Sequence, residues 1–142
     1  ARVSSHIRSL SPKVNFNRII VGHSAGGSAI ASAAQLGGLC AVDPVGVVFS
    51  DSTYGSWFRR SWNGCLKSLL TKGKARVLVL GQSFGAPWKA YSAWKRRNKA
   101  SSHSIEAHRL PLPWTHARIG NNALPFYWHA FPGEKYKNLY GE

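Results

Sequence analysis

Short hydrophobic runs alternate with amphipathic stretches along most of this chain. Residues 16–21 form the first such run, and an alanine-rich stretch through Gln35 follows it with the composition of a helix. Residues 45–49 and 76–80 have the β-branched character of buried strands. A further apolar run, residues 105–112, leads into a proline-rich loop. Strands that alternate with helices predict an α/β fold, with a mostly parallel sheet of about four strands joined by crossover helices.

The stretches around these runs have the spacing of amphipathic helices. We expect the second crossover helix to be interrupted at Gly64, and the last helix to begin near Pro125 before a polar tail. The helical segments expected outside the first crossover are residues 2–10, 54–70, 87–99 and 121–131. The chain contains no internal repeat or low-complexity tract, so we expect a single domain over residues 1–142.

Composition indicates a folded and strongly basic protein. Hydrophobic residues make up 44% of the chain, which excludes a disordered basic tail. The 19 Lys and Arg residues against 5 Asp and Glu give a formal net charge of +14, which attracts nucleic acid, anionic lipid surfaces or acidic cell-wall polymers. No apolar run approaches the roughly 18 residues of a membrane span, and the first 12 residues lack a signal-peptide core. We expect a soluble protein whose compartment the sequence leaves open, a virion included.

The two cysteines, Cys40 and Cys65, are too few and too far apart for a zinc ribbon or a disulfide framework. We interpret them as buried thiols. We expect neither a metal nor an organic cofactor, because the chemistry described next needs none. Methionine is absent, so residue 1 is not an initiator and we expect a trimmed or truncated chain.

The segment Gly22-His23-Ser24-Ala25-Gly26 matches the pattern G-x-S-x-G, directly after a hydrophobic strand and directly before a helix. In a turn this tight, a side chain at Gly22 or Gly26 should collide with neighbouring backbone. The hydroxyl of Ser24 would then project above the sheet as a nucleophile. The amide of Ala25 would point toward the oxyanion of a tetrahedral intermediate. The alternative is a glycine-rich turn without chemistry.

A second match, Gly81-Gln82-Ser83-Phe84-Gly85, also follows a strand. Serine hydrolases of this type run in the order Ser, then Asp or Glu, then His. After Ser83 the only acid before the late histidines is Glu106, at the start of a predicted strand. We therefore interpret residues 81–85 as a structural turn or a pocket wall.

Asp51 and His116 complete the better set for Ser24. Among the acids only Asp51 immediately follows a buried strand, where it would hold the tautomer of an imidazole and stabilise the imidazolium. Its alternative role is the cap of a helix that begins near Thr53. His116 lies in the loop after the last strand, where a general base would face Ser24, with His103 and His108 as alternatives. Asp43, just before a proline, is interpreted as a turn residue, and His23 as a packing residue.

These motifs resemble the α/β-hydrolase superfamily, specifically its carboxyl-terminal half, over residues 17–131. The resemblance rests on Gly-His-Ser-Ala-Gly-Gly at 22–27, on Thr-His-Ala-Arg-Ile-Gly at 115–120, and on the segment at 47–55. The segment at 47–55 is similar to a group of bacterial and phage-associated hydrolases. In these an Asp follows the strand after the nucleophile elbow, which is the turn that carries the G-x-S-x-G serine. A typical member has several further strands before its elbow. The resemblance therefore implies a sheet without its usual amino-terminal strands, whose open edge invites a partner chain.

Residues 57–62 and 88–99 interleave Trp and Tyr with Lys and Arg. Aromatic platforms beside positive charge suit nucleic acid or sugar rings that carry anionic groups. The same helical spacing marks a buried core face, so both interpretations stay open.

Two functions follow. The first is a serine hydrolase that cleaves an ester or amide, in a small molecule or an anionic or cell-wall substrate, through Ser24, His116, Asp51 and the Ala25 amide. The second is a hydrolase-like module that binds nucleic acid or takes part in virion assembly, with the triad incidental.

Overall fold

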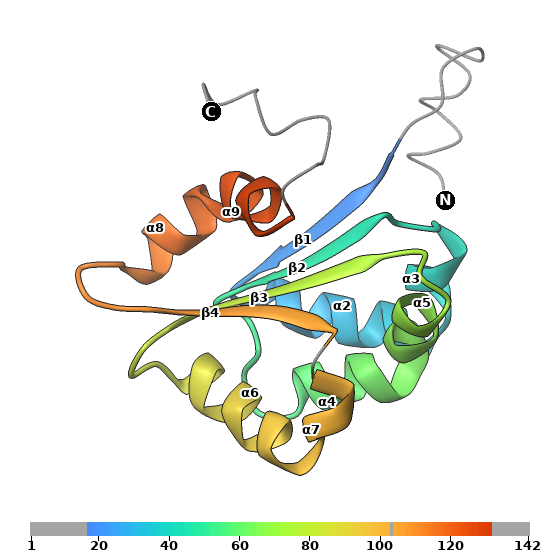
Figure 1. Cartoon of the computed structure of the whole chain (residues 1–142), viewed down its shortest axis with the longest axis horizontal. Helices are drawn as coiled ribbons and strands as arrows, with labels where there is room; N and C mark the ends of the chain where they lie inside the picture. The colour runs from blue at the N-terminus through green and yellow to red at the C-terminus, as the bar shows by residue number, and fades with distance from the viewer. Residues whose placement is uncertain (1–16, 103, 132–142) are drawn as a thin grey trace.

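A four-stranded, all-parallel sheet forms the centre of the molecule (Figure 1). The computed structural model describes residues 17–102 and 104–131. The strands lie in the order in which the chain forms them, and the α/β fold expected from the sequence is confirmed. They are β1 (Ile19–His23), β2 (Gly46–Ser50), β3 (Arg76–Gln82) and β4 (Ile105–Leu110). Parallel pairing brings all four carboxyl ends to the same edge of the sheet.

Helices cover both faces of the sheet. The three crossover connections pass over one face, whereas the last two helices lie on the other (Figure 1). The crossover helices are α2 (Gly26–Gln35), α3 (Gly38–Ala41), α4 (Trp57–Ser61), the π-helical turn η1 (Trp62–Leu66), α5 (Lys67–Thr71), α6 (Ala86–Arg97) and α7 (Lys99–Ser102). The opposite face carries α8 (His116–Asn121) and α9 (Ala123–Ala130).

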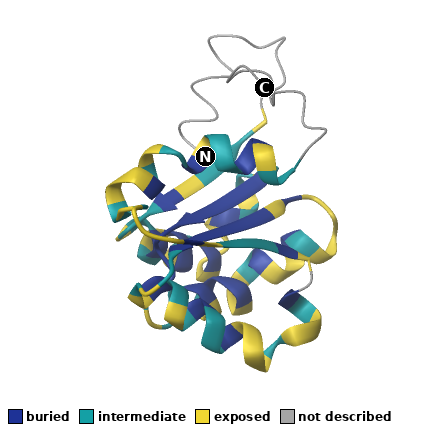
Figure 2. Ribbon diagram, turned by 60° about the vertical axis from the view of Figure 1, so that its left-hand side comes forward, coloured by how far each residue is buried: buried dark blue, intermediate teal, exposed yellow. Residues whose placement is uncertain are grey.

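Alternation along the central strands creates two cores. Val47 and Phe49 of β2 pack among the crossover helices, while Val48 between them packs against α8 and α9. The strands β2 and β3 are buried on both faces, and exposed side chains lie mainly on the outer helix surfaces (Figure 2). β1 and β4 are the edge strands of the described sheet, and Val21 in β1 is 38% exposed.

Aromatic side chains of α4, η1 and α6 form one buried cluster. Phe58 contacts Trp62, Tyr91 and Trp94 with ring centroids 4.8–6.3 Å apart. All four rings are buried. The core-face interpretation is therefore confirmed for these residues, and their rings are not open platforms for stacking.

Most predicted elements are present with small shifts at their ends. The break at Gly64 is confirmed, because its ψ of −117° interrupts the helix between α4 and α5. The last helix begins at Ala123, not at Pro125, because α8, which the sequence pattern did not suggest, precedes it directly. The helix expected at residues 2–10 and the polar tail lie outside the described residues.

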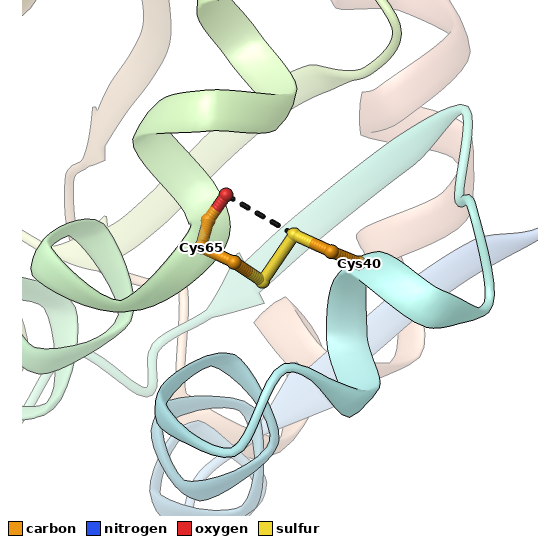
Figure 3. Close-up of a disulfide and its surroundings, with 2 residues drawn as sticks. All are labelled: Cys40 and Cys65. Carbon is orange, nitrogen blue, oxygen red and sulfur yellow. Dashed lines mark hydrogen bonds between the residues drawn. A yellow bond between two sulfur atoms is a disulfide. The ribbon is translucent and has the colours of Figure 1, made fainter.

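The interpretation of the cysteines as buried thiols is wrong. Cys40 in α3 and Cys65 in η1 form a disulfide, with Cα atoms 6.1 Å apart, and both are half-buried (Figure 3). The sulfur of Cys40 also lies 3.2 Å from the Cys65 carbonyl oxygen. Closing a loop of 25 residues restricts the unfolded chain and contributes roughly 3–4 kcal/mol in the chain-entropy account.

Two fully buried tyrosines differ in one hydrogen bond. In the described chain the Tyr91 hydroxyl has no partner, whereas the Tyr127 hydroxyl donates to the Val45 carbonyl oxygen at 3.2 Å. We expect Tyr91→Phe to raise the free energy of unfolding by about 1 kcal/mol, because it removes an unpaired buried polar group. Tyr127→Phe should lower it by about 1 kcal/mol. Urea denaturation of both variants measures the difference, and equal effects of the two substitutions would contradict the assignment.

Candidate active site

Ser24 occupies the sharp turn between β1 and α2. Its φ of 55° is left-handed, a conformation that costs a non-glycine residue about 1–2 kcal/mol. Its N–H donates to the Ser50 carbonyl oxygen at 3.3 Å, which ties the turn to the end of β2. In the described chain only Ser24, Asp43 and Asp51 combine a side chain with positive φ. The two G-x-S-x-G segments are thereby distinguished, since Ser83 lacks this conformation.

The two glycines around Ser24 play different parts. A Cβ at Gly22 would lie 2.9 Å from the Gly26 carbonyl oxygen and 2.5 Å from Ile30 Cδ1, so the expected collision is confirmed there. The same expectation for Gly26 is wrong, because a Cβ at that position meets nothing within 4 Å. Gly26 is the first residue of α2, and its side-chain direction is open space.

Asp51 lies directly after β2 and is 3% exposed. Its Oδ2 is 2.6 Å from His116 Nδ1, and its Oδ1 accepts from the Gln82 N–H at 3.2 Å. The alternative role as a helix cap is wrong, because the next helix begins at Trp57 and its cap position is Ser56. Asp43 is an exposed residue with positive φ between α3 and β2, as a turn residue would be.

The sequence pattern placed His116 in a loop. In the structure it is the first residue of α8. Thr115 caps this helix, its hydroxyl accepting from the Arg118 N–H at 3.1 Å. The His116 ring lies against the His23 ring, with centroids 4.3 Å apart. His23 Nδ1 is 2.9 Å from the Ser50 carbonyl oxygen, so the interpretation of His23 as a packing residue fits its position.

The three expected residues meet at the carboxyl edge of the sheet, but their contacts are unequal. Asp51 and His116 are joined directly across 65 residues of sequence. Ser24 is connected to this pair through adjacent residues. His23, which precedes it, packs on His116, and the Ser24 N–H donates to the carbonyl oxygen of Ser50, which precedes Asp51. Within the described chain, Ser24 Oγ forms no hydrogen bond with His116. Such a contact commonly tightens only when substrate is bound.

The alternative residues are engaged elsewhere. His108 pairs with Glu106 at 2.9 Å on β4, with both side chains about 40% exposed. The hydroxyl of Ser83 donates to the Leu110 carbonyl oxygen at 3.0 Å, which fits the structural turn expected for residues 81–85. His103 lies outside the described residues.

Two further residues belong to this site. Gln82 binds Asp51 through its backbone, and its side-chain amide donates to the Trp114 carbonyl oxygen at 3.1 Å, which holds the segment before His116. Tyr54 is the other residue, and the pKa of its hydroxyl is raised. The larger cause is burial, and the second is the negative charge of the nearby Asp51. The sequence feature that could have identified Gln82 is its position at the end of β3, the strand that pairs with β2 before Asp51.

The backbone N–H of Ala25 is a candidate donor at this site. Within the described chain, the Ala25 N–H donates to no backbone carbonyl. No group of three or more His, Cys, Asp or Glu that could hold a metal occurs among residues 17–102 and 104–131. None of the helices described is long and apolar enough to cross a membrane.

The contrast between Gly22 and Gly26 is testable. Gly22→Ala should lower the free energy of unfolding by about 1–3 kcal/mol, because the new methyl group overlaps backbone that cannot move freely. Gly26→Ala should leave it unchanged or raise it by up to about 1 kcal/mol, since alanine favours the helix. Urea denaturation compares the two, and a Gly26→Ala variant that loses as much stability as Gly22→Ala would refute this view of the turn.

Comparison of the chain with known protein families, curated proteins and solved structures finds no match. The site is therefore interpreted from its own geometry.

Proposed function

We propose that this chain is a serine hydrolase of the α/β-hydrolase type, which cleaves an ester or amide bond. The main support is the 2.6 Å hydrogen bond between the buried Asp51 carboxylate and His116, formed beside a left-handed Ser24. The order Ser, Asp, His along the chain and the position at the carboxyl edge of a parallel sheet agree with this class.

In the proposed reaction Ser24 Oγ attacks the substrate carbonyl carbon while His116 Nε2 accepts its proton. Asp51 accepts the hydrogen bond from the Nδ1–H of His116, which fixes the reactive tautomer and stabilises the imidazolium. His116 then gives its proton to the leaving oxygen or nitrogen, and an acyl-Ser24 ester remains. Water attacks this ester with His116 again as base, which releases the acid and restores the serine.

The amide of Ala25 is proposed to stabilise the oxyanion that forms during both attacks. Ala25 is the cap position of α2, directly after the nucleophile, where such a donor lies in this class of enzyme. A donor that is already oriented stabilises the developing charge without reorganisation.

The charge of the chain favours a substrate on an anionic surface or polymer. A net charge of +14 raises the local concentration of such substrates, and cell-wall esters or amides are one class of this kind. In the described sheet β1 has no strand on its outer side, and this edge is a place where a strand of another chain could pair and complete the sheet.

The alternative function, a module for nucleic acid or virion assembly, has less support. It rests on charge, and three of the aromatic rings that would stack on bases, those of Trp62, Tyr91 and Trp94, are buried around Phe58. Trp57 and Trp88 are half-buried. In such a module the hydrogen-bonded Asp51–His116 pair would be incidental.

A fluorophosphonate probe tests the proposal, because it reacts with activated serines. The wild-type chain should be labelled, Ser24→Ala should not, and Ser83→Ala should be labelled at the wild-type rate. His116→Gln and Asp51→Asn should slow labelling by about 10³-fold or more, as in other triads.

Circular dichroism shows whether each variant is folded. Labelling that survives in Ser24→Ala, or a folded wild-type chain that the probe does not label, would exclude the proposed function.

A further inference from the structure

A surface cavity of about 460 Å³ is lined by residues of α4, η1 and α6 and of the segment before α4. These helices lie on the sheet face that the crossover connections cover (Figure 1). This volume is in the range of sites for small ligands. Arg59 of α4, Asn63 of η1 and Arg97 of α6 line it. Ser56 and Asn98 supply further polar groups.

Two arginines line the cavity, and no acidic side chain is among its lining residues in the described chain. The ion pairs of the described chain use Asp51 and Glu106, each with a histidine, and neither acid lines the cavity. In the part of the chain that the structure describes, neither Arg59 nor Arg97 is paired with a carboxylate. The neighbouring Arg60, by contrast, donates twice to Gln35 Oε1, at 2.8 and 3.1 Å. The two lining guanidinium groups are therefore available to a ligand.

The backbone places the amide groups of the cavity. Gly64 approaches α2 so closely that a Cβ there would lie 2.7 Å from the Ala34 carbonyl oxygen, and its ψ of −117° breaks the helix. Asn63, at this break, is exposed and faces the cavity. The side-chain amide of Asn98 donates to the Trp94 carbonyl oxygen at 2.8 Å, which fixes it at the end of α6.

The chemistry of the lining selects the ligand. Guanidinium groups bind carboxylate and phosphate oxygens with two parallel hydrogen bonds. Carboxamide and hydroxyl groups add neutral donors. Trp94 also lines the cavity but is only 7% exposed, so it offers little ring surface for a base or a sugar.

We propose that this cavity is a binding site for the phosphoryl or carboxyl group of a small ligand, held by Arg59 and Arg97 with Asn63 and Asn98 as further donors. None of Ser24, Asp51 and His116 lines the cavity, and the proposal does not depend on the hydrolase function.

Isothermal titration with inorganic phosphate and with citrate, at constant ionic strength, tests the proposal and separates the two ligand chemistries. The wild-type chain should bind at least one of them with a Kd of about 1 mM or tighter. Arg59→Gln and Arg97→Gln should each weaken binding about tenfold or more, as expected for charged hydrogen bonds. Arg96→Gln is the matched control: it makes the same charge change on α6 at an exposed residue that does not line the cavity, and it should stay within about twofold of wild type.

Three results would overturn the site. One is a wild-type chain that binds neither anion at about 1 mM. Another is an equal loss in Arg96→Gln and Arg97→Gln, which would indicate only the general positive field. The third is a short DNA duplex whose binding Arg59→Gln and Arg97→Gln weaken while the binding of phosphate and citrate is unchanged, which would indicate a nucleic-acid surface.

Discussion

The candidate site depends on the hydrogen bonds of the buried Asp51 carboxylate. A carboxylate that is 3% exposed needs partners, because an unpaired buried charge costs several kcal/mol. One oxygen binds His116 and the other binds the Gln82 N–H. The carboxylate thereby joins the ends of β2 and β3 to the start of α8. Loss of this group would release the imidazole and leave the carboxyl edge of the sheet without its central contact.

Local sequence signals predicted most of the framework and the residues of the site. The runs at β2 and β3 are buried on both faces, so hydrophobicity alone located them. Ser24 and Asp51 each come directly after a strand in the sequence. The carboxyl ends of parallel strands lie at one edge of the sheet, where functional residues gather. His116 was located by order, but not as part of a helix, because α8 has only 6 residues and its cap, Thr115, follows a proline-rich loop.

Other features depend on distances that sequence does not contain. The Cys40–Cys65 disulfide requires two helices to meet with Cα atoms 6.1 Å apart, and a separation of 25 residues does not reveal this. The backbone bond from Gln82 to Asp51 depends on strand register. Within residues 17–102 and 104–131, the structure was needed to show that Asp51 and Glu106 pair with histidines and not with Arg59 or Arg97 of the cavity.

The catalytic assignment is tested most directly by a crystal structure of the chain after reaction with a fluorophosphonate. We expect the phosphorus bonded to Ser24 Oγ, its oxygen within hydrogen-bond distance of the Ala25 N–H, and His116 still bound to Asp51 with Nε2 facing Ser24. A phosphorus atom on another residue, or an imidazole turned away from Ser24 in the adduct, would contradict the assignment.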